Sequence, residues 1–133
     1  MALAINPAEV LETYYGAIDD GRLDDAFEHF AEDARQRFGN GPVLEGRQAI
    51  LAGATEFLGQ FKRLRHDITN VLAGDYPTVG FEVTVTYTLP SDAATSLPGA
   101  AVCEFGPDGR FTDMRIYVDL APVVAGLTAT AEI

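Results

Sequence analysis

Residues 79–89, VGFEVTVTYTL, are the clearest indication of the fold class of this chain. Its apolar residues occupy alternate positions, with Gly, Glu and Thr between them. Alternation of this kind predicts a strand with one apolar face, and β-branched and aromatic residues favour the extended conformation. The residues expected on the apolar face are Val79, Phe81, Val83, Val85 and Tyr87.

Further strands are expected on both sides of this stretch. The sequence Gly-Pro-Asp-Gly at 106–109 predicts a hairpin turn, and Ala-Gly-Asp at 73–75 ends an earlier extended segment. Strands joined by hairpins predict an antiparallel sheet. The expected strands cover residues 64–73, 79–89, 100–105 and 110–118, with shorter ones at 34–38 and 43–45.

Amphipathic helices are expected before the sheet. Asn6 is a good N-cap, Pro7 suits the first helical position, and the helix is expected to end at Gly21. A short second helix around 23–30 and a third after Glu45 and Gly46 also keep a helical apolar period. The sequence therefore predicts an α+β domain in which three N-terminal helices cover the apolar face of a curved antiparallel sheet. One domain is expected over 1–133, with 121–133 as a C-terminal tail.

Charge and composition exclude several functions. Nine basic against 20 acidic residues give a net charge of −11, which disfavours nucleic acid and anionic membranes as partners. No apolar stretch approaches the ~20 residues of a membrane span. No signal peptide is expected, and the single Cys103 cannot form an internal disulfide, so a cytoplasmic location is expected.

Motifs for cofactors and metals are missing from the sequence. No Gly-rich phosphate loop follows a strand, and no Gly-x-Ser-x-Gly elbow occurs. The two histidines, His29 and His66, lie in separate predicted elements without other ligands at metal-binding spacing. Neither a cofactor nor a metal is expected.

Four segments together carry a family resemblance: VLETYYGAIDDGRLDD at 10–25, FAEDA at 30–34, EGRQAI at 45–50 and GRFTDMRIYVD at 109–119. They resemble the nuclear transport factor 2-like superfamily, and within it the SnoaL-like and ketosteroid-isomerase-like bacterial proteins. The resemblance extends over about residues 7–122. It implies a cone-shaped half-barrel that opens to a small apolar ligand, and a homodimer.

Only some of the catalytic residues of these relatives have a counterpart of the same type in this sequence. The resemblance places Tyr14 at the tyrosine of a ketosteroid-isomerase oxyanion hole. It places Phe38 and Ala101 at that enzyme's two carboxylates, and Ile116 at the aspartate of the polyketide cyclases. Asp113, Arg115 and Asp119 offer the residue types of an epoxide hydrolase, but in the wrong order and on the face directed away from the pocket.

Three residues remain candidates for catalysis. Tyr14 is either a core tyrosine or a donor to a ligand carbonyl, and Tyr15 beside it is expected at the rim. His66 is the most adaptable acid–base group, although the apolar pattern leaves open which face of its strand points inward. Asp119 ends the last strand, where an ion-pair role on the outer face is the alternative.

An apolar lining is expected for the pocket. The lining would suit a flat hydrophobic ligand such as a steroid-, terpenoid- or polyketide-like carbonyl compound. An isomerase or cyclase is the first interpretation, a non-catalytic binding module is the alternative, and an epoxide hydrolase is disfavoured. The candidate ligand-binding residues are Phe38, Phe57, Phe61, Phe81, Val83, Tyr87, Met114 and Ile116.

Overall fold

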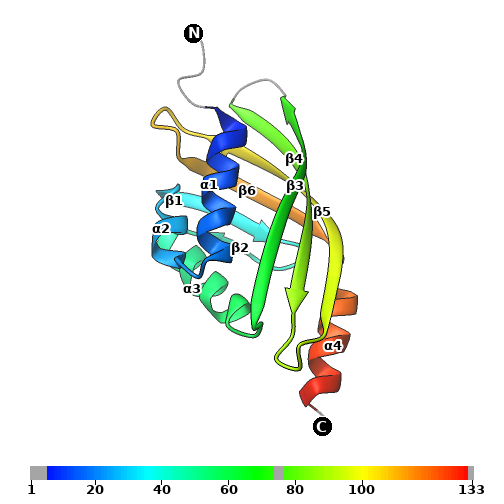
Figure 1. Ribbon diagram of the computed structural model, residues 1–133. Coiled ribbons are helices and arrows are strands. Elements are labelled where there is room, and N and C mark those ends of the chain that lie inside the picture. Colours follow the sequence, from blue (N-terminus) through cyan, green and yellow to red (C-terminus); the bar gives the residue numbers. More distant parts are fainter. Residues whose placement is uncertain (1–5, 74–76, 132–133) are drawn as a thin grey trace.

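A six-stranded sheet with helices packed on one face forms the body of the molecule (Figure 1). The computed structural model describes residues 6–73 and 77–131. Along the chain its elements are α1 (Pro7–Asp19), α2 (Leu23–Phe27), β1 (Phe30–Phe38), β2 (Val43–Glu45), α3 (Arg47–Leu58), β3 (Arg63–Ala73), β4 (Thr78–Thr88), β5 (Ala94–Phe105), β6 (Phe111–Val118) and α4 (Ala121–Ala131). The α+β class predicted from the sequence is confirmed.

The strands lie in the order β2-β1-β6-β5-β4-β3. Four of the five pairings are antiparallel, as expected, whereas β1 and β6 run parallel. The parallel pair joins the N-terminal part of the sheet to its C-terminal part, and the chain between them contains α3 and four strands. Hairpin signals in the sequence report only on neighbouring strands, so this long-range pairing was not predicted.

The alternation in β4 determines which face is covered. Every second residue from Val79 to Tyr87 is buried, while Glu82 is exposed on the opposite face. Figure 1 shows α1, α2 and α3 together on one side of the sheet. The prediction that the apolar face of β4 meets the helices is therefore confirmed.

Strand β5 begins earlier than predicted, at Ala94 rather than at position 100. Residues 94–98 pair with β4, and the hydroxyls of Thr86 and Ser96 lie 2.8 Å apart across this pairing. Pro98 is tolerated because β6 pairs with β5 only from Gly99 onward, so this part of β5 has a neighbour on one side alone. The sequence did not predict this part of β5, because a stretch rich in Ser, Pro and Gly is more typical of a loop than of a strand.

The segment expected as a C-terminal tail contains helix α4. The Asp119 carboxylate accepts a hydrogen bond from the Ala121 backbone N–H at 3.0 Å, which caps the helix start. Val123 is fully buried, whereas Val124 beside it is exposed. Helix α4 lies beyond the ends of β4 and β5 and apart from the other three helices (Figure 1).

An aromatic cluster joins α1 to the sheet. The ring of Tyr14 makes edge contacts with Phe27, Phe30 and Phe111 at centroid distances of 5.3–5.8 Å. Such contacts add to the stabilisation from burial. Phe30, predicted at the end of the second helix, is instead the first residue of β1, and its ring stacks on Phe27.

The contact made by α4 can be tested with two neighbouring valines. Val123→Ala should lower the free energy of unfolding by about 2 kcal/mol, because it removes two buried methyl groups and leaves a small cavity. Val124→Ala is the matched control and should stay within about 0.5 kcal/mol of the wild type. Urea unfolding measures both, and equal effects would show that α4 does not pack as described.

Candidate functional site

A cavity of about 210 Å³ lies between the helices and the inner face of the sheet. Its walls come from α1, α2 and α3 on one side and from every strand of the sheet on the other. Most of the lining is aliphatic or aromatic. The lining residues are Tyr14, Tyr15, Ile18, Phe27, Gln36, Phe38, Leu44, Gly53, Ala54, Phe57, Leu58, Leu64, His66, Val83, Val85, Tyr87, Gly99, Ile116 and Val118.

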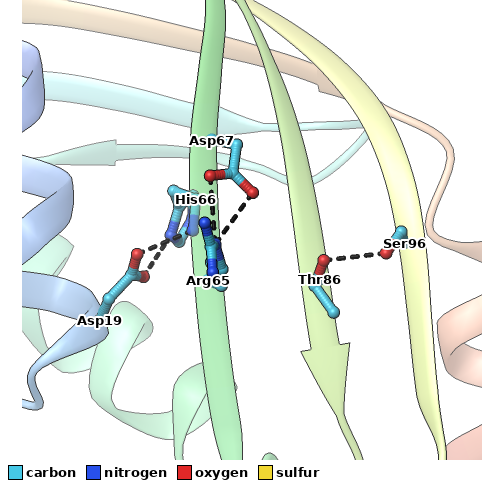
Figure 2. Close-up of polar contacts among 6 residues, drawn as sticks. All are labelled: Asp19, Arg65, His66, Asp67, Thr86 and Ser96. Atoms are coloured by element: carbon cyan, nitrogen blue, oxygen red, sulfur yellow. Dashed lines mark hydrogen bonds and ion pairs between the residues drawn. The ribbon is translucent and has the colours of Figure 1, made fainter.

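His66 and Asp19 form a hydrogen-bonded pair at this cavity (Figure 2). The ring Nδ1 of His66 lies 2.6 Å from Oδ1 of Asp19, and the His66 backbone N–H donates to Oδ2 at 2.7 Å. A carboxylate only accepts hydrogen bonds, so Nδ1 carries the proton. In the neutral ring Nε2 is then the basic nitrogen, and it is left available for chemistry.

The local sequence explains how each partner reaches this position. His66 lies opposite Val85 in the β3–β4 pairing, and Val85 points inward. A register shift between Ile68 and Asn70 then reverses the alternation, which leaves Leu72 exposed on the outer face. This bulge is the reason that the apolar pattern of β3 did not reveal its inner face.

Asp19 was not predicted as a site residue. It is the last residue of α1, where the helix dipole disfavours a negative charge. The two hydrogen bonds from His66 offset this cost. The sequence did contain a signal for Asp19 as a site residue. Asp19 directly follows the apolar Ile18 at a helix C-terminus, and the last turn of this helix has no basic residue to pair with it.

The ring of Tyr15 stacks on the ring of His66, with centroids 4.4 Å apart and planes 25° apart. Tyr15 was expected at the rim of the pocket, but it is buried. The curvature of β3 brings this strand against the flank of α1, so two adjacent helical positions both face inward. The phenol ring and Asp19 together fix the orientation of the imidazole.

Four buried polar side chains border the cavity without hydrogen-bond partners among the described residues: Tyr14, Tyr15, Gln36 and Tyr87. Burial raises the pKa of Tyr87 to about 12 and holds the pKa of Tyr14 and of Tyr15 well above the ordinary value. The phenols are therefore neutral donors at physiological pH. Among the described residues, the fully buried side-chain polar atom without a partner is Arg47 Nε, so these four polar groups are not sealed off by the protein. Their hydrogen-bonding capacity is open to a molecule in the cavity.

The candidate residues from the sequence divide into three groups. Tyr14 and His66 border the cavity, whereas Asp119 lies outside its lining and caps α4. Five of the expected ligand-binding residues line the cavity: Phe38, Phe57, Val83, Tyr87 and Ile116. The remaining three belong to the packed core around it: Phe61, Phe81 and Met114.

Gln36 was also missed. It shares the inner face of β1 with Ala34 and Phe38, and it is the one polar side chain among the buried residues of that strand. The alternation of residues 34, 36 and 38 indicated that Gln36 points inward. A polar residue between two inward apolar residues is uncommon, and this marked it as a candidate site residue.

The lining carries no lysine or arginine among the residues that the structure describes. In that same part of the chain, no three His, Cys, Asp or Glu side chains gather as a metal site would require. No helix within residues 6–73 or 77–131 is long and apolar enough to cross a membrane. The site therefore offers an imidazole–carboxylate pair, phenols and an amide in an apolar surrounding.

Comparison with protein families gives a match over most of the chain. The model of the SnoaL-like domain matches residues 11–114. No curated protein matches the sequence.

Several solved structures share the fold. A putative polyketide cyclase from Xanthomonas campestris pv. campestris is 27% identical, with 90% of this chain and 95% of that chain covered and a TM-score of 0.72. An NTF2-like protein of unknown function from Burkholderia pseudomallei K96243 is 15% identical over 89% and 94% of the two chains, with a TM-score of 0.78. SalBIII, described as an epoxide hydrolase/cyclase-like enzyme with a role in pyran ring formation in the polyether salinomycin, is 20% identical over 85% and 90%, with a TM-score of 0.75.

The buried phenols predict an alkaline transition. Tyr87 has a raised pKa in the folded state, so its burial stabilises the fold fully below the unfolded-state pKa of about 10 and less as pH rises toward 12. Urea unfolding at pH values from about 8 to 11.5 should show a falling free energy of unfolding above pH 10. Tyr87→Phe should make the free energy of unfolding fall less steeply with pH. If the pH dependence of the variant equals that of the wild type, the buried environment described for Tyr87 is contradicted.

Proposed function

The chain belongs to the SnoaL-like domain family, and from this premise we propose that it is an acid–base enzyme that isomerises or cyclises a small, uncharged carbonyl compound. The observation that carries the proposal is the Asp19–His66 pair at an apolar cavity bordered by unpartnered phenols. An imidazole held by a carboxylate is a recurrent general base, and a neutral phenol suits a developing oxyanion.

In the proposed reaction, Nε2 of His66 removes a proton from the carbon next to the substrate carbonyl. Asp19 stabilises the imidazolium that forms, and a phenol such as that of Tyr14 donates a hydrogen bond to the enolate oxygen. For isomerisation, the imidazolium returns the proton to a different carbon of the enolate. For cyclisation, the enolate carbon attacks a second carbonyl of the same molecule, and the imidazolium protonates the resulting alkoxide.

The size and charge of the cavity narrow the substrate class. Its volume of about 210 Å³ is moderately larger than the ~150 Å³ cavity that accommodates one benzene ring. A terpenoid or small aromatic polyketide of one or two rings fits this space better than a four-ring steroid. A lining without cations and a net charge of −11 favour an uncharged substrate over a carboxylate or phosphate.

The base in this proposal differs from the one that the resemblance implies. Apolar Phe38, Ala101 and Ile116 hold the positions at which related enzymes are expected to carry carboxylates. The alternative, a non-catalytic binding module of the same fold, rests on this loss. The Asp19–His66 pair favours the enzyme, because a binding module has no need of an oriented imidazole.

We further propose that the chain forms a homodimer through the outer face of the sheet. That face carries exposed Tyr117 beside a cluster in which Arg115 contacts both Glu104 and Asp113. A face with both signs of charge and an exposed aromatic ring is suited to a semi-polar interface.

Sedimentation at micromolar concentration tests the dimer. The wild type should have the mass of two chains, and Tyr117→Asp should shift it toward one, because it buries an unpaired charge at the interface. Val43→Asp is the control, since Val43 is similarly exposed but lies on the edge strand β2. A monomeric wild type would remove the dimer proposal.

Turnover tests the enzyme proposal. The protein should convert a β,γ-unsaturated cyclohexenone into its conjugated isomer and exchange the α-protons of α-tetralone in D₂O. His66→Ala should slow both reactions at least ~100-fold, the usual contribution of a general base. Asp19→Asn should lower kcat while leaving KM nearly unchanged, because it disturbs the tautomer of His66 and not the binding surface.

Asp20→Asn is the matched control for Asp19→Asn. Asp20 adjoins Asp19 in the sequence but is exposed and paired with Arg22, so its loss should leave both rates unchanged. Undetectable turnover of these ketones by the wild type, despite their binding to the cavity, would favour the binding module. Turnover that survives His66→Ala would remove the role assigned to the imidazole.

A further inference from the structure

Gln36 is the buried residue with a polar, non-aromatic side chain among the described residues. It is only 8% exposed, and it borders the cavity. No hydrogen bond joins its amide to another described residue. In that part of the chain the fully buried side-chain polar atom without a partner is Arg47 Nε, so the amide of Gln36 is not sealed off by the protein and remains open to a hydrogen-bond partner.

The sheet places Gln36 and His66 far apart along its inner face. Gln36 is on β1 and His66 is on β3, with β6, β5 and β4 between them. The inner face of the intervening strands contributes only apolar groups to the cavity, apart from Tyr87: Val83, Val85, Gly99, Ile116 and Val118. The cavity therefore has a basic group on one wall and an amide on another, with apolar surface between.

We propose that Gln36 is a specificity-determining residue, which binds a second oxygen of the substrate at the end remote from the reacting carbonyl. This inference rests on the proposed function, because it takes the His66 side as the reacting side. An amide both donates and accepts, so it matches a hydroxyl or a carbonyl. Without a nearby cation it matches an uncharged oxygen better than a carboxylate.

This assignment gives a reason for an amide on a mostly apolar wall. Among the described residues no protein group makes a hydrogen bond to the amide, and an apolar side chain of similar volume would suit the surrounding wall at least as well. A ligand oxygen would supply the missing hydrogen bond. Ligands that lack this oxygen would leave the amide unpaired, so they would bind less tightly.

Two bicyclic ketones of the same shape test the assignment. α-Tetralone has one oxygen, and its hydroxy derivative carries a phenol on the edge remote from the carbonyl. The wild type should bind the hydroxy derivative about tenfold more tightly in calorimetric titration, the usual worth of one well-formed hydrogen bond. Gln36→Met, which keeps the side-chain volume, should remove this preference. His66→Ala should keep the preference, because it alters the opposite wall.

A second readout separates recognition from a structural role. If Gln36 serves the ligand and not the fold, Gln36→Met should melt no lower than the wild type in the absence of ligand. Gln48→Met, at an exposed glutamine of α3, is the control and should leave both melting and binding unchanged. A Gln36→Met protein that melts lower would show that the amide supports the fold, and this would overturn the assignment.

The outcomes for the two proposals are distinguishable. If the wild type binds neither tetralone, the proposed function of the cavity fails, and this assignment fails with it. If the wild type binds both ketones equally, or if Gln36→Met keeps the tenfold preference, only the assignment of Gln36 fails. Turnover that survives His66→Ala, together with an intact preference for the hydroxy derivative, contradicts the catalytic role of His66 and leaves the assignment of Gln36 in place.

Discussion

The six-stranded sheet has one apolar face, and this face has to be shielded from water. Strand β4 buries every second side chain, and its neighbours continue that face, so a second layer has to exclude water from it. Three short helices provide this layer. Because the sheet curves and the helices are straight, they cover the face without filling the space beneath them, and the cavity is the result.

The polar groups around this cavity differ in how they are held. The residues that carry three phenols and one amide are buried, and no hydrogen bond joins these groups to another described residue. The Asp19–His66 pair is the exception, since both carboxylate oxygens are bonded. In the proposed site, hydrogen bonds hold the imidazole of His66 in place, whereas the phenols and the amide are free to bind a ligand.

The proposed base lies in a different part of the fold from the carboxylates that the resemblance implies. The positions at which the resemblance implies carboxylates lie on β1, β5 and β6 and hold apolar residues here. The acid–base pair instead joins the end of α1 to β3 on the other side of the cavity. A cavity surrounded by many elements offers several places for a base, and function then depends on which of them carries one.

The amino-acid sequence was sufficient to predict most element types, the inner face of β4, the cap at Asn6 and the mostly apolar composition of the pocket, because these depend on local periodicity and side-chain chemistry. Three features became visible only in the folded chain: the parallel pairing of β1 with β6, the inward direction of His66 in the bulged strand β3, and the contact of His66 with Asp19, 47 positions earlier. The folded chain also showed the burial of Gln36 and the packing of α4. These features depend on segments distant in sequence, and their meeting follows from how the sheet curves and how the helices lie on it.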